Sequence, residues 1–123
     1  MKKIIVADDD KFLANAYRVK LTKAGFDVKV ARDGTEVFEL LKTFIPDLII
    51  LDLVMPTKDG FTTLEELKND AHFASIPVIV ASNLGQKEDS DKALKLGAVD
   101  CIVKSDLSLD DLIQKINHTV GSS

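Results

Sequence analysis

Short apolar runs alternate with helix-type patterns five times along this 123-residue chain, and this alternation restricts the fold more than any other feature. Continuous apolar runs predict strands that are buried on both faces, whereas apolar residues spaced three or four apart predict helices. The expected strands cover residues 3–8, 26–31, 47–53, 78–82 and 100–103. Regular alternation of strands and helices predicts an α/β fold, a parallel sheet with helices on both faces.

Capping signals set the expected helix ends. Asp10 is a candidate N-cap for a first helix that ends at Gly25, and the remaining helices are expected over 35–43, after Gly60, over 86–96 and after a capping box at 108–111. Asp59, directly before Gly60, is interpreted as a turn residue. The helix over 86–96 is polar in its first half, so we expect it to be weakly anchored and mobile.

Length and charge limit the possible classes of protein. The chain fits one domain, expected over residues 1–120 with a C-terminal tail at 121–123. A net charge of −4 without a Lys/Arg cluster argues against direct binding to nucleic acid. No apolar stretch approaches the ~20 residues of a membrane span, and the single Cys101, expected to be a small buried hydrophobe, fits a reducing compartment. We therefore expect a cytoplasmic protein with no membrane partner.

Polar residues recur where the expected strands end. Asp8 and Asp9 end the first strand, Asp52 ends the third, Ser82 ends the fourth, and Lys104 follows the fifth. The carboxyl ends of parallel strands all meet at one edge of the sheet, where ligands bind. Burying an unpaired charge costs several kcal/mol, while a domain is stable by only about 5–15 kcal/mol. A carboxylate at the end of a buried strand, as at Asp52, therefore indicates a functional role.

These residue types together suit one kind of chemistry. Clustered carboxylates repel one another unless a proton or a cation neutralises them, and an all-oxygen site suits Mg²⁺. The Lys104 ammonium and the Ser82 hydroxyl would complete a site for a tetrahedral dianion, with the Asp52 carboxylate as the nucleophile. Taken singly, Asp8 or Asp9 could cap a helix, Ser82 could bond to backbone and Lys104 could be solvated. The joint pattern carries the interpretation.

The same residues resemble the receiver domain of bacterial response regulators over essentially the whole chain. The matching motifs are the acidic run at 6–10, the phosphoacceptor strand and Met-Pro loop at 51–56, Asp59-Gly60, the switch hydroxyl Ser82, and Val103-Lys104. The resemblance implies a doubly wound, flavodoxin-like sheet of five parallel strands in the order 2-1-3-4-5. The chemotaxis regulator of this family is itself an example of that order, so the expected order rests on the resemblance.

The resemblance also implies the roles of individual residues. Asp52 would accept phosphate from a sensor histidine kinase or a phosphotransfer protein. Asp9, Asp52 and the Val54 backbone carbonyl would bind Mg²⁺ directly, and Asp8 through water, while Ser82 and Lys104 would bind the phosphate. The face formed by the fourth helix, the fifth strand and the fifth helix would bind a downstream protein, in a monomer or a phosphorylation-dependent dimer. Such a chain is a signalling switch that transfers phosphate only to itself.

The chain departs from the family pattern at three positions. Ser105 replaces the usual proline after the lysine, so the sequence leaves both cis and trans possible for the Lys104–Ser105 peptide. Cys101 replaces an aromatic switch residue, and Asn83 replaces a small residue. Val54 and Leu84 flank the expected path of the hydrolytic water and are apolar. We therefore predict slow self-dephosphorylation, with the competing hypothesis that the Asn83 amide orients water and speeds the reaction.

Other classes fit less well. A haloacid-dehalogenase-type phosphohydrolase needs a second acid two residues after the nucleophile, where this chain has Val54. A flavin-binding protein of similar topology would need a phosphate cradle rich in hydroxyls and glycines after the first strand, where this chain is rich in Asp. A receiver-like interaction module that takes no phosphate remains the main alternative.

Overall fold

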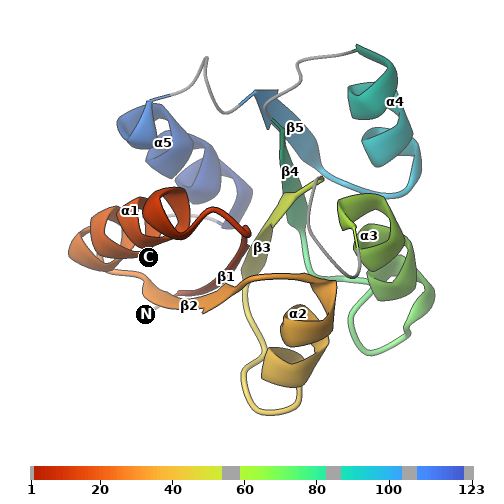
Figure 1. Cartoon of the computed structure of the whole chain (residues 1–123), viewed down its shortest axis with the longest axis horizontal. Coiled ribbons are helices and arrows are strands. Elements are labelled where there is room, and N and C mark those ends of the chain that lie inside the picture. The colour runs from red at the N-terminus through yellow and green to blue at the C-terminus, as the bar shows by residue number, and fades with distance from the viewer. Residues whose placement is uncertain (1, 54–58, 83–86, 104–107, 121–123) are drawn as a thin grey trace.

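The computed structural model describes residues 2–53, 59–82, 87–103 and 108–120 as a sheet with helices on both faces (Figure 1). The strands are β1 (Lys3–Ala7), β2 (Asp27–Ala31), β3 (Leu48–Asp52), β4 (Val78–Ser82) and β5 (Asp100–Val103). The helices are α1 (Lys11–Lys23), α2 (Gly34–Leu41), α3 (Gly60–Asn69), α4 (Lys87–Lys95) and α5 (Leu109–Val120). Each strand predicted from the sequence is present, within a residue or two of its expected ends.

The five strands are parallel and lie in the order β2-β1-β3-β4-β5. Helices α1 and α5 cover one face of the sheet, and α2, α3 and α4 cover the other (Figure 1). This confirms the doubly wound, flavodoxin-like fold expected from the sequence and the resemblance. It also makes β1 and β3 neighbours at the centre of the sheet, where the strand order reverses direction.

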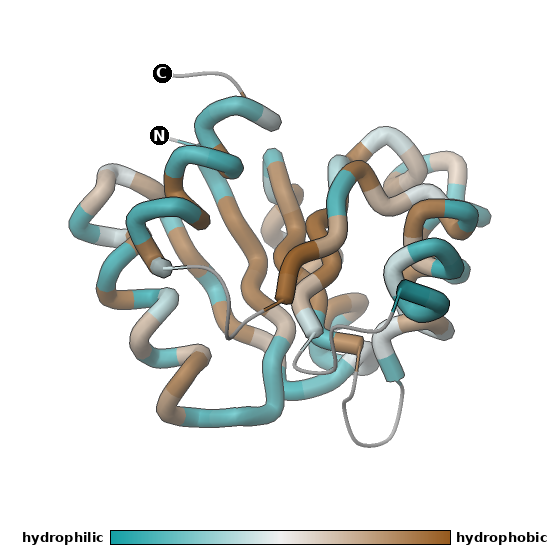
Figure 2. Tube along the Cα trace, turned by 90° about the horizontal axis from the view of Figure 1, so that it is seen from above, coloured by the Kyte–Doolittle hydropathy of each residue, from teal (hydrophilic) through white to brown (hydrophobic). Residues whose placement is uncertain are grey.

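Two apolar clusters, one on each face, hold the sheet in place. The central strands β3 and β4 are buried along their whole length, which explains why they are continuous apolar runs. Figure 2 shows the hydrophobic residues gathered along the strands and the hydrophilic ones on the outer turns of the helices. Along the described segments, no helix is long and apolar enough to cross a membrane.

Side-chain caps fix where the helices begin. Asp10 caps α1 by accepting from the amides of Phe12 (3.0 Å) and Leu13 (3.1 Å), as predicted. The interpretation of Asp59 as a turn residue was wrong, because its Oδ1 accepts from the Thr62 amide at 2.8 Å and caps α3. Asp33 caps α2 in the same way, so this helix starts at Gly34, one residue earlier than expected.

Helix α4 is weakly anchored, as its polar sequence predicts. Ala93 is its only buried residue among those described, and Lys92 places its ammonium 4.3 Å from the centre of the Phe61 ring on α3. This cation–π contact adds an attachment that the apolar surface of the helix does not supply.

Lys68 links α3 to the segments that precede β4 and β5. The Nζ of Lys68 on α3 donates to the carbonyls of Ala74 (3.1 Å) and Ile76 (2.7 Å), and partial burial lowers the pKa of Lys68. Its aliphatic chain lies against Gly97, which has a φ of 110° and ends the segment after α4. Lys68 therefore ties three segments together at the end of the sheet opposite the carboxyl ends of the strands.

Candidate functional site

Strand register brings the acidic residues together at the carboxyl edge of the sheet. Strands β1 and β3 are neighbours (Figure 1). Ala7 of β1 pairs with Leu51 of β3, so the residues that follow, Asp8 and Asp52, end adjacent strands at the same level. Asp9 comes next along the chain, before the Asp10 cap starts α1. The local sequence places each acidic residue at the end of its strand. The residues form a cluster only because β1 and β3 are neighbours in the sheet.

Burial differs among the three acids. Asp8 and Asp52 are 2% and 7% exposed, respectively, whereas Asp9 is exposed to solvent. Asp8 is held at both ends: its amide donates to the Ala31 carbonyl at 2.9 Å, and its Oδ1 accepts from the Asp10 amide at 2.9 Å. The residues Asp8 and Asp52 are thus in the protein interior, and Asp9 lies on the solvent side of the cluster.

One carboxylate oxygen from each of Asp8, Asp9 and Asp52 lies within 4.8 Å of the other two. Three oxygens at this spacing repel one another when ionised, and they form the type of donor set that hard divalent cations bind. These are the three acidic residues predicted from the sequence to lie at this edge, and the structure brings all three together.

Ser82 lies at the same edge, on the strand next to Asp52. It ends β4, is 4% exposed, and follows Ala81, which pairs with Asp52. Ser82 therefore ends its strand at the acidic edge, and its role as the switch hydroxyl stays a prediction. The predicted roles of Val54, Asn83, Leu84 and Lys104, and the Lys104–Ser105 peptide, lie outside the described residues and stay predictions.

Cys101 lies in β5 and is half-buried, so it is less buried than the small buried hydrophobe expected from the sequence. It packs against the apolar cluster on the α2–α4 face, and its amide donates to Oδ1 of Asp100 at 2.8 Å. The Asp100 carboxylate also pairs with Lys115 of α5 at 2.8 Å. The ion pair therefore joins β5 to α5 beside Cys101, the position at which the resemblance implies an aromatic residue.

Sequence reasoning missed the contact that Gly60 makes at this edge. Gly60, the first residue of α3, donates its amide to the Leu53 carbonyl at 3.0 Å and lies directly against the backbone of Asp52. The Asp-Gly pair was interpreted as a turn, although an Asp followed by an amphipathic segment is also a helix-capping signal. Only the folded chain shows that this glycine touches the acidic edge.

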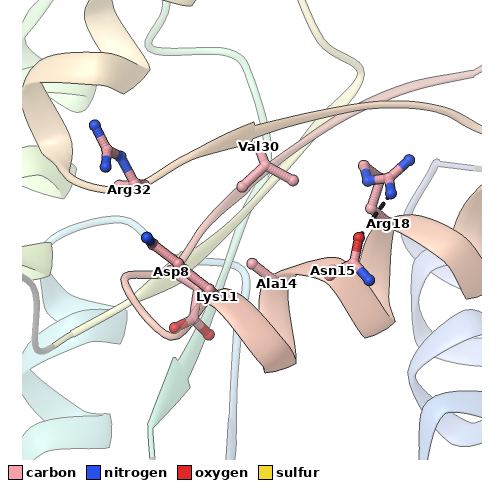
Figure 3. Close-up of a pocket in the computed structure, with 7 residues that line it drawn as sticks. All are labelled: Asp8, Lys11, Ala14, Asn15, Arg18, Val30 and Arg32. Atoms are coloured by element: carbon pink, nitrogen blue, oxygen red, sulfur yellow. Dashed lines mark hydrogen bonds between the residues drawn. The ribbon is translucent and has the colours of Figure 1, made fainter.

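A pocket of about 200 Å³ lies beside the acidic cluster and shares Asp8 with it (Figure 3). Its lining comes from the end of β1, from α1 and from the end of β2, and includes Arg18, which donates to Asn15 at 2.6 Å. Arg32, at the β2 end, is engaged with Glu36 at 3.3 Å. Because Asp9 and Asp52 do not line it, the pocket is a neighbour of the acidic cluster and not its binding cavity.

Comparison with known proteins identifies the fold and the family. The sequence model of the response regulator receiver domain matches residues 4–117. Response regulator RR06 of Streptococcus pneumoniae is 39% identical to this chain, over 95% of the chain and 52% of its own length. The chain spans about half or less of the length of the first curated relatives that it matches.

Solved structures agree with this result. The receiver domain of the Francisella response regulator 1452 is 36% identical and superposes with a TM-score of 0.89, covering 98% of this chain and 97% of that domain. The phosphorylated cyanobacterial phytochrome response regulator RcpA is 32% identical with a TM-score of 0.82, covering 95% and 89% of the two chains. With the acidic edge and the strand order described above, these matches show that the chain belongs to the response regulator receiver domain family.

Proposed function

We propose that this receiver domain is a phosphorylation-dependent switch in which Asp52 accepts a phosphoryl group. The observation that carries the proposal is a buried Asp52 carboxylate within 4.8 Å of two further acids at the switch point of the sheet. Receiver domains are signalling modules of two-component systems, and they interact with histidine kinases or phosphotransfer proteins and with downstream targets. RcpA, which shares this fold, was solved in a phosphorylated form.

The acidic cluster offers the oxygen donors that a magnesium ion binds, at slightly more than ligand spacing. Two oxygens on one Mg²⁺ lie at most about 4.2 Å apart, twice the usual Mg–O distance. The three carboxylate oxygens lie within 4.8 Å of one another, which is slightly more than this largest separation between two ligands of one Mg²⁺. We assign Asp9 and Asp52 as direct ligands, with the Val54 carbonyl, and Asp8 as a ligand through water. When bound, the ion would neutralise the carboxylates and the charge on the transferred group.

The residues of the chain then have distinct tasks in the transfer. The bond between phosphorus and the donor histidine nitrogen breaks as a bond from phosphorus to an Asp52 carboxylate oxygen forms, and the histidine keeps the electron pair. Ser82 donates a hydrogen bond to a phosphate oxygen, and Lys104 supplies a positive charge. The protein contributes mainly positioning and charge neutralisation, as in other phosphoryl transfers.

The proposed output is a change in the face formed by α4, β5 and α5. Phosphate on Asp52 would draw Ser82 towards it, and Ser82 pairs in the sheet with Val103 of β5. A weakly anchored α4 can respond at low energetic cost, since few buried contacts have to break. This face would bind a downstream protein or a second copy of the chain. The proposed receiver unit covers residues 1–120.

Mass measurement after exposure to a small phosphodonor tests the proposal. The protein is incubated with Mg²⁺ and acetyl phosphate, and its intact mass is recorded. We expect a gain of one phosphate in the wild type, none in Asp52→Ala, and an unchanged gain in Asp91→Ala, which removes an exposed carboxylate from α4. The absence of a gain in the wild type would contradict the proposal and favour a receiver-like interaction module. A gain that survives in Asp52→Ala would contradict the choice of Asp52.

A further inference from the structure

Gly60 occupies a place that admits no side chain. A Cβ built at this position would lie 2.6 Å from the Cα of Leu53 and 2.9 Å from the carbonyl carbon of Asp52, and closer still to the Asp52 carbonyl oxygen. All three atoms belong to backbone, so no flexible side chain can move aside. A methyl group at residue 60 has to displace either the start of α3 or the Asp52–Leu53 peptide.

Backbone conformation does not explain why this residue is glycine. Among the described glycines only Gly25 and Gly97 have a positive φ, so the backbone of Gly60 is accessible to any L-residue. The choice of glycine at the start of α3 therefore reflects the space available between α3 and the end of β3.

One hydrogen bond joins the start of α3 to the end of β3, and two more fix the first turn of the helix itself. The Gly60 amide donates to the Leu53 carbonyl at 3.0 Å. The hydroxyl of Thr63, which is fully buried, donates to the Asp59 carbonyl at 2.8 Å, and the Asp59 side chain caps the same turn. The first turn of α3 is thus fixed, and at Gly60 it meets the end of the phosphoacceptor strand through one amide hydrogen bond and a Cα that carries no side chain.

We propose that Gly60 is a positioning residue, through which the start of α3 sets the place of the Asp52 carboxylate relative to Asp8 and Asp9. The inference rests on the proposed function of Asp52. Beyond that function, the inference makes the metal site depend on Gly60, an uncharged residue that contacts the backbone of Asp52 and Leu53. Because hydrogen bonds fix the first turn of α3, we expect a Cβ at residue 60 to move the Asp52–Leu53 peptide and so to disturb the spacing of carboxylate oxygens that now lie within 4.8 Å.

The test compares Gly60→Ala with Gly34→Ala. Gly34 is also buried, is also the first residue of its helix, and also follows a capping aspartate, Asp33. For each variant, Mg²⁺ affinity and the rate of phosphorylation by acetyl phosphate are measured on folded protein, and urea unfolding is measured in EDTA. Loss of groups that orient metal ligands typically lowers metal affinity by about 10–100-fold. We expect a loss of that size in Gly60→Ala, with slower phosphorylation at saturating acetyl phosphate, and neither change in Gly34→Ala.

The outcomes separate positioning from simple stability. Gly60→Ala with reduced stability in EDTA but unchanged Mg²⁺ affinity and phosphorylation would overturn the inference. If Gly60→Ala does not fold, Asp59→Ala takes its place, because it releases the cap that fixes the start of α3; unchanged Mg²⁺ affinity in that variant would overturn the inference equally. A wild type that binds no Mg²⁺ or takes no phosphate contradicts the proposed function itself, which keeps the two failures distinguishable.

Discussion

Replacing Asp9 with asparagine is expected to stabilise the metal-free domain. Asp9 is exposed and contributes one oxygen to the cluster with Asp8 and Asp52, at separations up to 4.8 Å. At that distance two unit charges repel by about 0.9 kcal/mol in water and by about 3.5 kcal/mol at an effective dielectric constant of about 20. Because Asp9 faces solvent, the lower figure applies to both of its pairs. Allowing for screening by salt, Asp9→Asn should gain about 1–2 kcal/mol.

Magnesium is expected to make the wild type more stable than Asp9→Asn. A ligand that binds only the folded state stabilises it by RT ln(1 + [L]/Kd). The wild type should recover a deficit of about 1–2 kcal/mol once Mg²⁺ reaches roughly 4–30 times its Kd, whereas Asp9→Asn, lacking a direct ligand, should respond far less. The two stability curves should therefore cross as Mg²⁺ is added.

Urea unfolding followed by circular dichroism measures both effects. The free energy of unfolding is determined for each protein in EDTA and at a series of Mg²⁺ concentrations at constant ionic strength. Asp91→Asn, which removes an exposed carboxylate of α4, is the control and should stay within about 0.5 kcal/mol of the wild type. The electrostatic reasoning is refuted if Asp9→Asn is less stable than the wild type in EDTA, or if both proteins gain equally from Mg²⁺.

Other parts of the chain give four more predictions. Val54→Asn should shorten the lifetime of the phosphorylated protein, because a polar group would admit and orient water; an unchanged rate of phosphate loss contradicts the prediction. Amide hydrogen exchange should be faster in α4 than in α1, and faster again in Lys92→Ala, which loses the contact with Phe61; exchange in α4 no faster than in α1 speaks against it. Lys68→Met should lower the free energy of unfolding by about 1–2 kcal/mol, because two loop carbonyls lose their donor. Because the pKa of Lys68 is lowered in the folded protein, the unfolded chain binds more protons at pH values between the folded pKa and the ordinary lysine value of 10.5. The contribution of Lys68 to the free energy of unfolding should therefore rise with pH across that window. Lys68→Met should show no such rise.

Local sequence was enough to define the elements and the residues at their ends. Hydrophobic periodicity is local, so the continuous runs at 47–53 and 78–82 predicted buried parallel strands, and Asp10 predicted the start of α1. The same local pattern placed Asp8, Asp9, Asp52 and Ser82 at strand ends. Local signals failed where a residue had two ordinary interpretations, as with Asp59, which is a turn residue by composition and a helix cap in the structure.

Which of those ends meet depends on the packing of the whole chain. Strand order is set by how each helix crosses over the sheet, and no single segment encodes it; the order came from the family resemblance and was confirmed by the pairing of β1 with β3. The burial of Asp8 and Asp52 against the exposure of Asp9 arises only when those strands are neighbours. The close approach of Gly60 to the backbone of Asp52 is made by the packing of α3 on β3, and excluded volume of that kind leaves no signature in composition or periodicity.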